Sequence, residues 1–206
     1  MNFEEQMSRG GAQALEQAGR FFMRDDPVHD TLRRITGKLD ELSIAYAVVD
    51  GMALVAHGYD RTTMDVDILI TPDGLAAAHE ALAGRGYVQP FEGSRQLRDT
   101  QSNVRIEFLI TGEYPGDGKP KPVAFPDPDG AADEIDGIRY VRLVNLIELK
   151  LSSGMTNSGR LRDLADVQEL VRARQLTEDV ASRLDPYVRD KYLELWRAVQ
   201  ADAGER

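Results

Sequence analysis

The sequence predicts an α+β fold with an α/β core: a mixed sheet with flanking helices, followed by a C-terminal helical bundle. Two observations carry this prediction. Short apolar or alternating segments, typical of strands, fall within residues 44–143, interspersed with helical signals. After residue 143, apolar residues recur at three- and four-residue steps, as they do in amphipathic helices. Strands that come first and helices that come last indicate this arrangement.

We divide the 206 residues into three parts. Residues 1–25 are expected to form a peripheral N-terminal helix or a loose segment, because Gly10 and Gly11 weaken the helical pattern. Residues 26–143 form the α/β core, and residues 144–206 form the C-terminal helical region. A compact core with a helical appendage suits a chain of this length.

Composition excludes several classes of protein. With no cysteine, the chain can form neither a disulfide nor a thiolate metal site. No apolar run approaches the roughly 20 residues that span a bilayer, and the N-terminus lacks the pattern of a signal peptide. We therefore expect no membrane partner and a cytoplasmic location. A net charge of −10 argues against non-specific DNA binding, which relies on Lys and Arg to neutralise phosphates.

Helix and strand signals follow one another through the core. Asp26-Pro27 predicts a helix start, with the aspartate as N-cap and the proline at the first helical position. The apolar segment 44–49 predicts a short strand, and Gly51 opens a short helix. A further helix is expected around residues 73–83.

The most loop-like part of the chain is segment 111–137, which holds five prolines and five glycines. It is longer than a routine connection, so we expect a functional loop or a covered extension with a short strand at 123–125. A strand at 138–143 follows. The remaining chain predicts helical segments, with two starts supplied by Thr177 and Asp185-Pro186.

Two strand segments carry acidic side chains on one face. Asp65 and Asp67 alternate with apolar residues in segment 64–70, which places both carboxylates on the same face. Glu107 alternates in the same way in segment 104–110. Carboxylates buried together cannot all stay ionised unless a cation compensates them, and hard oxygen ligands favour Mg²⁺ or Mn²⁺ over zinc. The three acids are therefore candidate metal ligands, although two acids spaced in this way are also common in strands that bind no metal.

The stretch VVDGMALVAHGYDRTTMDVDILI, residues 48–70, resembles the signature of the nucleotidyltransferase superfamily, in particular of AbiEii-like and related minimal bacterial nucleotidyltransferases. That signature has a glycine pair or Gly-Ser after a strand, a short helix, and two alternating acids on the next strand. The tail is similar too, with a lysine-bearing helix before an Arg/Lys-Asp-Leu-Ala-Asp helix, so the resemblance covers roughly residues 28–173. The residues at the second glycine, the two acids and the third acid are Gly51, Asp65, Asp67 and Glu107.

The resemblance implies a nucleotidyltransferase-like mixed sheet and a metal-dependent reaction. Asp65 and Asp67 would bind two divalent ions, and Glu107 would bind one and orient the acceptor hydroxyl. That hydroxyl would attack the α-phosphate of a nucleoside triphosphate, and pyrophosphate would leave. Backbone N–H groups at Gly51 would receive the terminal phosphates. The acceptor would be a small molecule, a protein side chain or a tRNA end, and a toxin of a toxin–antitoxin pair is one variety.

Asp50 departs from this signature, because it stands where the first glycine belongs. Either its bulk and charge lie beside the expected polyphosphate, or it serves as a helix N-cap. The alternative to an enzyme is therefore a catalytically degenerate relative that binds a nucleotide or a partner protein. A plainer alternative is an interaction protein that uses its C-terminal helices.

Three basic residues are candidates for contacts at this site. Arg61 is expected to contact a phosphate or a structural carboxylate, and Arg105 is expected to pair with the acids or to touch substrate. Lys150 lies in an apolar helix, where a semi-buried lysine is unusual, so we predict that it binds the nucleotide.

Two further acids receive a structural role. Asp163 and Asp166 lie three residues apart and so share a helix face. We expect them to anchor a basic neighbour, and the candidates for that neighbour are Lys150, Arg160 and Arg162.

Overall fold

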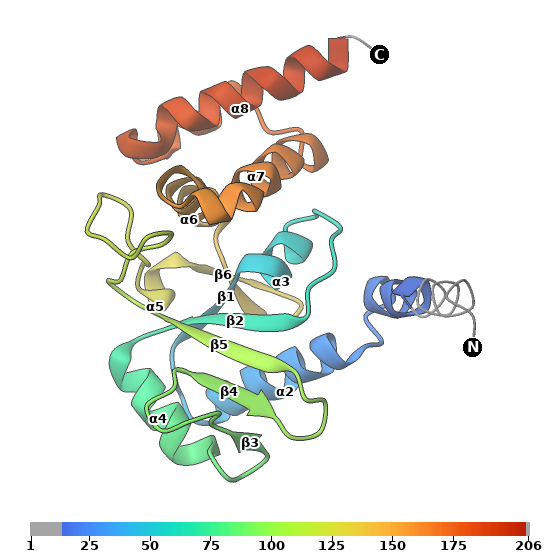
Figure 1. Ribbon diagram of the computed structural model, residues 1–206, viewed down its shortest axis with the longest axis vertical. Helices are drawn as coiled ribbons and strands as arrows, with labels where there is room; N and C mark the ends of the chain where they lie inside the picture. Colours follow the sequence, from blue (N-terminus) through green and yellow to red (C-terminus); the bar gives the residue numbers. More distant parts are fainter. Residues whose placement is uncertain (1–13, 205–206) are drawn as a thin grey trace.

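The computed structural model describes residues 14–204 (Figure 1). Part of the segment expected at 1–25 therefore lies outside the described residues. Residues 14–22 are helical and largely exposed, but Phe21 is buried and packs with the hydrophobic core.

Within the described residues, the core is a seven-stranded mixed sheet with the order β3-β4-β5-β2-β1-β7-β6. β2 lies in the middle, parallel to β5 and antiparallel to β1. The strands are β1 (Tyr46–Val49), β2 (Asp65–Ile70), β3 (Tyr87–Val88), β4 (Gln96–Asp99), β5 (Arg105–Ile110), β6 (Ala132–Ile135) and β7 (Ile138–Val141).

The helices gather in two regions. The C-terminal helices α6, α7 and α8 lie together at one end of the molecule, and α4 lies with β3 at the other end (Figure 1). Among residues 14–204, no helix is both long enough and apolar enough to cross a bilayer. After the helical residues 14–22, the α-helices are α2 (Pro27–Glu41), α3 (Asp50–Ala56), α4 (Pro72–Leu82), α5 (Pro128–Ala131), α6 (Leu143–Thr156), α7 (Leu161–Ala173) and α8 (Pro186–Gly204).

The start of α2 follows from its first residues. The Oδ1 atom of Asp26 accepts hydrogen bonds from the backbone N–H groups of Val28, at 2.8 Å, and His29, at 3.3 Å. Pro27 occupies the first turn, where the N–H that it lacks has no helical partner. The predicted N-cap is therefore confirmed.

The two central strands have the alternation that the sequence predicts. Val66, Ile68 and Ile106 are fully buried on one side of the sheet, and the acidic residues of β2 and β5 point to the other side. Burial of apolar side chains on one face fixes the register, because a slip by one residue would turn them to the opposite face. Burial of the apolar face therefore also determines that the acidic side chains lie on the opposite face of the sheet.

Other elements differ from expectation. No strand forms at 123–125, where flanking prolines lack the N–H groups that a ladder needs. Instead, the N–H of Phe125 donates to the carbonyl oxygen of Glu113, and the carbonyl oxygen of Phe125 accepts from the N–H of Gly112, each at 2.8 Å. Segment Glu178–Arg183 forms a 3-10 helix, and Thr177 makes no side-chain capping bond there. The short strands β3, β4 and β6 had no strong sequence signal.

Candidate active site

The sheet brings the three predicted metal-binding acids to one surface. Asp65 and Asp67 lie on β2, and Glu107 lies on the parallel neighbour β5, in register with Asp67. Register partners on adjacent strands lie about 4.8 Å apart. All three residues line one cavity of about 650 Å³ between the sheet and the C-terminal helices.

Asp67 lies in the most acidic surroundings. Burial raises the pKa of its carboxyl well above the usual value, and the nearby charges of Asp50, Asp65 and Glu107 raise this pKa further. Arg105 opposes them and lowers it, but only in part. This excess of hard carboxylate oxygens suits a divalent cation such as Mg²⁺ or Mn²⁺, which takes oxygen ligands. By its chemistry the donor set therefore fits the ion that the resemblance implies. The ligand atoms of Asp65, Asp67 and Glu107 do not all lie within 4.8 Å of one another, however; among the described residues, the acids that meet this spacing are Asp50, Asp163 and Asp166.

Arg105 is the cation closest to these acids. It is the register partner of Asp65, and its guanidinium forms an ion pair with the Asp65 carboxylate. A second contact joins the Arg105 Nη2 atom to Glu107 Oε2 at 3.7 Å. The expected pairing of Arg105 with the acids is thus what the structure shows.

Gly51 has a packing role. A Cβ atom at this position would lie 2.8 Å from the Cβ of Thr63, so only glycine lets the segment before β2 pass so closely. The Thr63 hydroxyl in turn donates a 2.8 Å hydrogen bond to Asp65 Oδ1. Thr63 lines the cavity, whereas Gly51 is not among its lining residues. Gly51 therefore positions Asp65 through Thr63, a link that the sequence pattern does not reveal.

Lys150 is buried on α6 and lies within a second group of acids. Its Nζ atom is 2.8 Å from Asp163 Oδ1 and 2.9 Å from Asp166 Oδ2, and it also pairs with Asp50. Burial lowers the pKa of Lys150, but the three carboxylates outweigh burial and hold that pKa above its usual value. The predicted anchoring of Lys150 by Asp163 and Asp166 is therefore confirmed.

The carboxylates around Lys150 do not form an open metal site. Oxygen atoms of Asp50, Asp163 and Asp166 lie within 4.8 Å of one another, a spacing that a metal could use. However, the ammonium group contacts all three, and it supplies the compensating charge that a metal would bring.

Arg61 joins the same buried network. Its Nη1 atom donates to both oxygens of Asp166, at 3.0 and 2.8 Å. The structural carboxylate expected as one contact of Arg61 is thus Asp166, and the phosphate contact stays a prediction. Among the described residues, its buried Nε has no hydrogen-bond partner. Arg160 and Arg162, the other expected partners of the α7 acids, are exposed residues in the wall of the cavity.

Asp50 does not act as a helix N-cap, so that expectation is wrong. It is the first residue of α3, Val49 is the N-cap, and no side chain caps this helix. The backbone of Asp50 has φ of 49°, in the left-handed region that favours glycine. Burial raises the pKa of the Asp50 carboxyl, but Lys150, together with the charges of Arg61 and Arg160, outweighs burial and holds the pKa below its usual value.

The cavity also has an apolar part. Leu109 follows Glu107 by two residues on β5 and so shares its face. Phe125, Leu146 and Leu149 complete this apolar wall. The cavity can therefore receive a ligand that is charged at one part and apolar at another.

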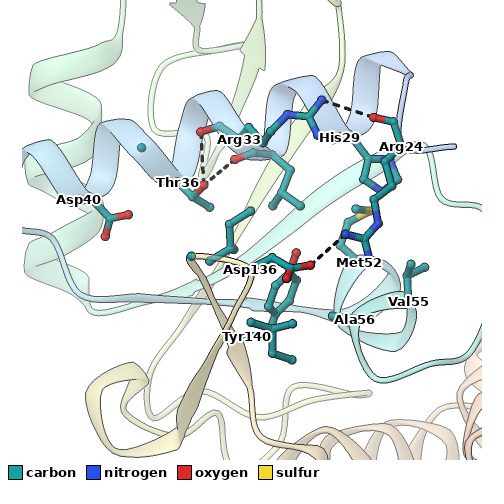
Figure 2. A pocket seen from close by; sticks show the side chains of 15 residues that line it. Arg24, His29, Arg33, Thr36, Asp40, Met52, Val55, Ala56, Asp136 and Tyr140 are labelled. Carbon is teal, nitrogen blue, oxygen red and sulfur yellow. Dashed lines mark hydrogen bonds and ion pairs between the residues drawn. The ribbon is translucent and has the colours of Figure 1, made fainter. Parts of the chain in front are cut away.

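A second cavity, of about 240 Å³, lies between α2, α3 and the β6–β7 hairpin (Figure 2). An ion pair of 2.9 Å between Arg24 and Asp136 joins its two sides. His29, in its wall, is already bonded to Asp26. None of the predicted site residues lines this cavity, so the chemistry expected from the sequence belongs to the larger one.

The mixed sheet, with acids on adjacent strands and helices packed beyond them, defines a nucleotidyltransferase-like fold. Among solved structures, ANT(2")-Ia in complex with adenylyl-2"-tobramycin is similar, with a TM-score of 0.51 and 12% identity over 84% of this chain and 97% of that chain. This likeness concerns the fold alone.

Two further solved structures are similar at lower scores. A provisionally assigned nucleotidyltransferase from H. pylori has a TM-score of 0.46 and 18% identity, covering 84% of this chain and 92% of that one. Another provisionally assigned nucleotidyltransferase, from Thermotoga maritima, has a TM-score of 0.42 and 15% identity, covering 71% and 89%. No protein-family model and no curated protein matches the sequence.

Proposed function

We propose that this protein transfers a nucleotidyl group from a nucleoside triphosphate to a hydroxyl acceptor, with Mg²⁺ or Mn²⁺ as cofactor. One observation carries the proposal: Asp67 and Glu107 are register partners on parallel strands, with Asp65 on the same face, in a cavity of about 650 Å³. Three carboxylates held on a buried sheet keep the fixed geometry that a catalytic metal site needs.

Asp65, Asp67 and Glu107 would hold the divalent ions, which supply charge stabilisation for the attacking and leaving oxygens. Glu107 would also orient the acceptor hydroxyl. A bond then forms between the acceptor oxygen and the α-phosphorus, the bond to the β-phosphate oxygen breaks, and pyrophosphate leaves. The hydroxyl proton passes to solvent.

Lys150 and Arg61 are the proposed contacts for the triphosphate. Both line the cavity, and Arg61 has a buried Nε without a partner in the described part of the chain. The ammonium of Lys150 has three N–H donors, and three carboxylates already surround it. A phosphate would therefore have to replace one of these carboxylates, and Asp50 is the most exposed of them.

The acceptor is proposed by class only. Small molecules, protein side chains and tRNA ends all offer a hydroxyl group. In the ANT(2")-Ia structure the adenylyl group is attached to tobramycin, a small molecule. We propose in addition an AbiEii-like relationship, supported by the signature at residues 48–70, and a toxin role is one form of that proposal.

A second candidate function is a catalytically degenerate protein that binds nucleotide or a partner protein. Two contacts favour it. The carboxylate of Asp50 forms an ion pair with Lys150, and the guanidinium of Arg105 forms one with Asp65. Both contacts engage groups that the proposed enzyme would use, Lys150 for the triphosphate and Asp65 for the metal.

A labelling experiment separates the two functions. The chain is incubated with Mn²⁺ or Mg²⁺ and each α-³²P-labelled nucleoside triphosphate, together with tobramycin, bulk tRNA or a protein extract. Transfer of label with release of pyrophosphate, lost in Asp67→Asn, is the expected result. Triphosphate binding without transfer to any acceptor class would support the degenerate protein and contradict the enzyme.

A further inference from the structure

Arg105 occupies an unusual place among the proposed metal ligands. β5 presents Arg105 and Glu107 two residues apart on one face, and the parallel register sets Arg105 opposite Asp65. The guanidinium pairs with Asp65 and lies 3.7 Å from Glu107. Two of the three carboxylates proposed to bind metal are thus contacted by one cation of the chain itself.

The guanidinium of Arg105 can also be released from these carboxylates into solvent. Its side chain is 42% exposed, whereas the Asp65 side chain is 24% exposed. A guanidinium at the surface can turn into solvent without opening a cavity in the core, and ion pairs at such exposure contribute little net stability. The contact between Arg105 and Asp65 is therefore one that a stronger cation can displace.

We propose that Arg105 competes with the divalent cation for Asp65 and Glu107, and so sets the metal concentration at which the site loads. This inference rests on the proposed function, because it assumes that the three acids bind metal. A guanidinium left beside a doubly charged ion would be repelled by it, so metal binding and the Arg105 contacts exclude each other.

The chain offers a matched control in Arg98. Arg98 on β4 is the register partner of Arg105 and shares its face of the sheet. Its guanidinium donates to the Asn103 carbonyl oxygen at 2.8 Å. Arg98→Gln therefore also removes one positive charge, but from a position one strand further from Asp65 and Glu107. It removes no contact to these two acids.

The test is calorimetric titration of the full chain with Mn²⁺ at fixed ionic strength. We expect Arg105→Gln to bind Mn²⁺ roughly three- to tenfold more tightly than wild type, the size expected when one nearby like charge is removed in a partly solvated site. Arg98→Gln should bind as wild type does. Arg105→Lys keeps the charge and should stay within about twofold of wild type.

Three outcomes would overturn the inference. One is equal or weaker Mn²⁺ binding by Arg105→Gln while wild type binds, which leaves the proposed function standing. Another is an equal gain in Arg98→Gln, which would make the effect a general one of charge. The third is no Mn²⁺ binding by any variant, or binding unchanged in Asp67→Asn, and this outcome would remove the proposed metal site as well.

Discussion

Lys150 and Asp50 form an ion pair that joins α6 to the first residue of α3. The same ammonium group contacts Asp163 and Asp166 on α7. One buried lysine therefore joins α3 to the consecutive helices α6 and α7, in the wall of the proposed nucleotide site. Its structural and its proposed binding role must be separated by experiment.

Lys150→Ala should lower the free energy of unfolding by about 3–5 kcal/mol, because it leaves buried carboxylates without their cation. Lys191→Ala is the control, since Lys191 pairs with Glu194 at the surface and its loss should cost at most about 0.5 kcal/mol. Urea unfolding measures both. If the folded Lys150 variant keeps wild-type triphosphate affinity, the lysine is structural only.

Asp50→Gly should bind triphosphate several-fold more tightly than wild type in the presence of Mg²⁺. The change removes a carboxylate that competes for Lys150, and it places glycine where φ is 49°. Asp50→Asn separates the two effects, because asparagine tolerates this backbone region but carries no charge. Calorimetry with a non-hydrolysable triphosphate should show a gain in both variants. Unchanged or weaker binding in both would refute the idea that Asp50 impairs the site.

Asp67→Asn should raise the melting temperature of the metal-free protein. Asp67 lies among other carboxylates that raise its pKa, so its ionised form opposes folding at neutral pH. The variant should also lose any stabilisation that Mn²⁺ gives the wild type. Thermal melts in EDTA and in Mn²⁺ test both statements. A lower melting temperature in EDTA would show that the ionised carboxylate is needed for packing.

Asp99, which lies outside the proposed active site, should make the stability of the fold depend on pH. The side chain of Arg34 on α2 donates to Asp99 Oδ2 at 3.0 and 2.6 Å. Burial raises the pKa of Asp99, but the bonds from Arg34 and two backbone N–H groups outweigh burial and hold it below the usual value.

A lowered folded-state pKa means that this stabilisation is present above the unfolded value of about 4 and is lost as the pH falls through the folded value. Asp99→Asn should therefore be less stable than wild type at pH 7, and the difference should shrink as the pH falls below about 4. Melting curves from pH 7 to pH 2 follow this difference. A gap that stays constant would show that the charge of Asp99 is not involved.

The central strands could be predicted from the sequence because their side chains alternate with a period of two. That period predicts the common face of Asp65 and Asp67, whereas the place of Glu107 on the same sheet face follows from the parallel pairing of β2 with β5. The sequence also predicts the anchoring of Lys150 by α7, because a lysine in an apolar helix needs a partner when it is buried.

Other features depend on contacts that a sequence pattern does not contain. The pairing of Arg105 with Asp65 follows from the register of β2 and β5. The packing of Thr63 over Gly51 depends on the path of the chain before β2. For Asp50, a signal did exist: the resembled signature has glycine there, and glycine favours the positive φ that Asp50 adopts.

The most direct test of the account is a crystal structure of the chain with Mn²⁺ and a non-hydrolysable nucleoside triphosphate. Anomalous diffraction at the manganese edge locates the metal independently of the protein density. The account predicts an anomalous peak bound by Asp67 and Glu107, with Asp65 as a further ligand and Arg105 turned away from both Asp65 and Glu107. Triphosphate bound in the cavity with no manganese at these acids would contradict it.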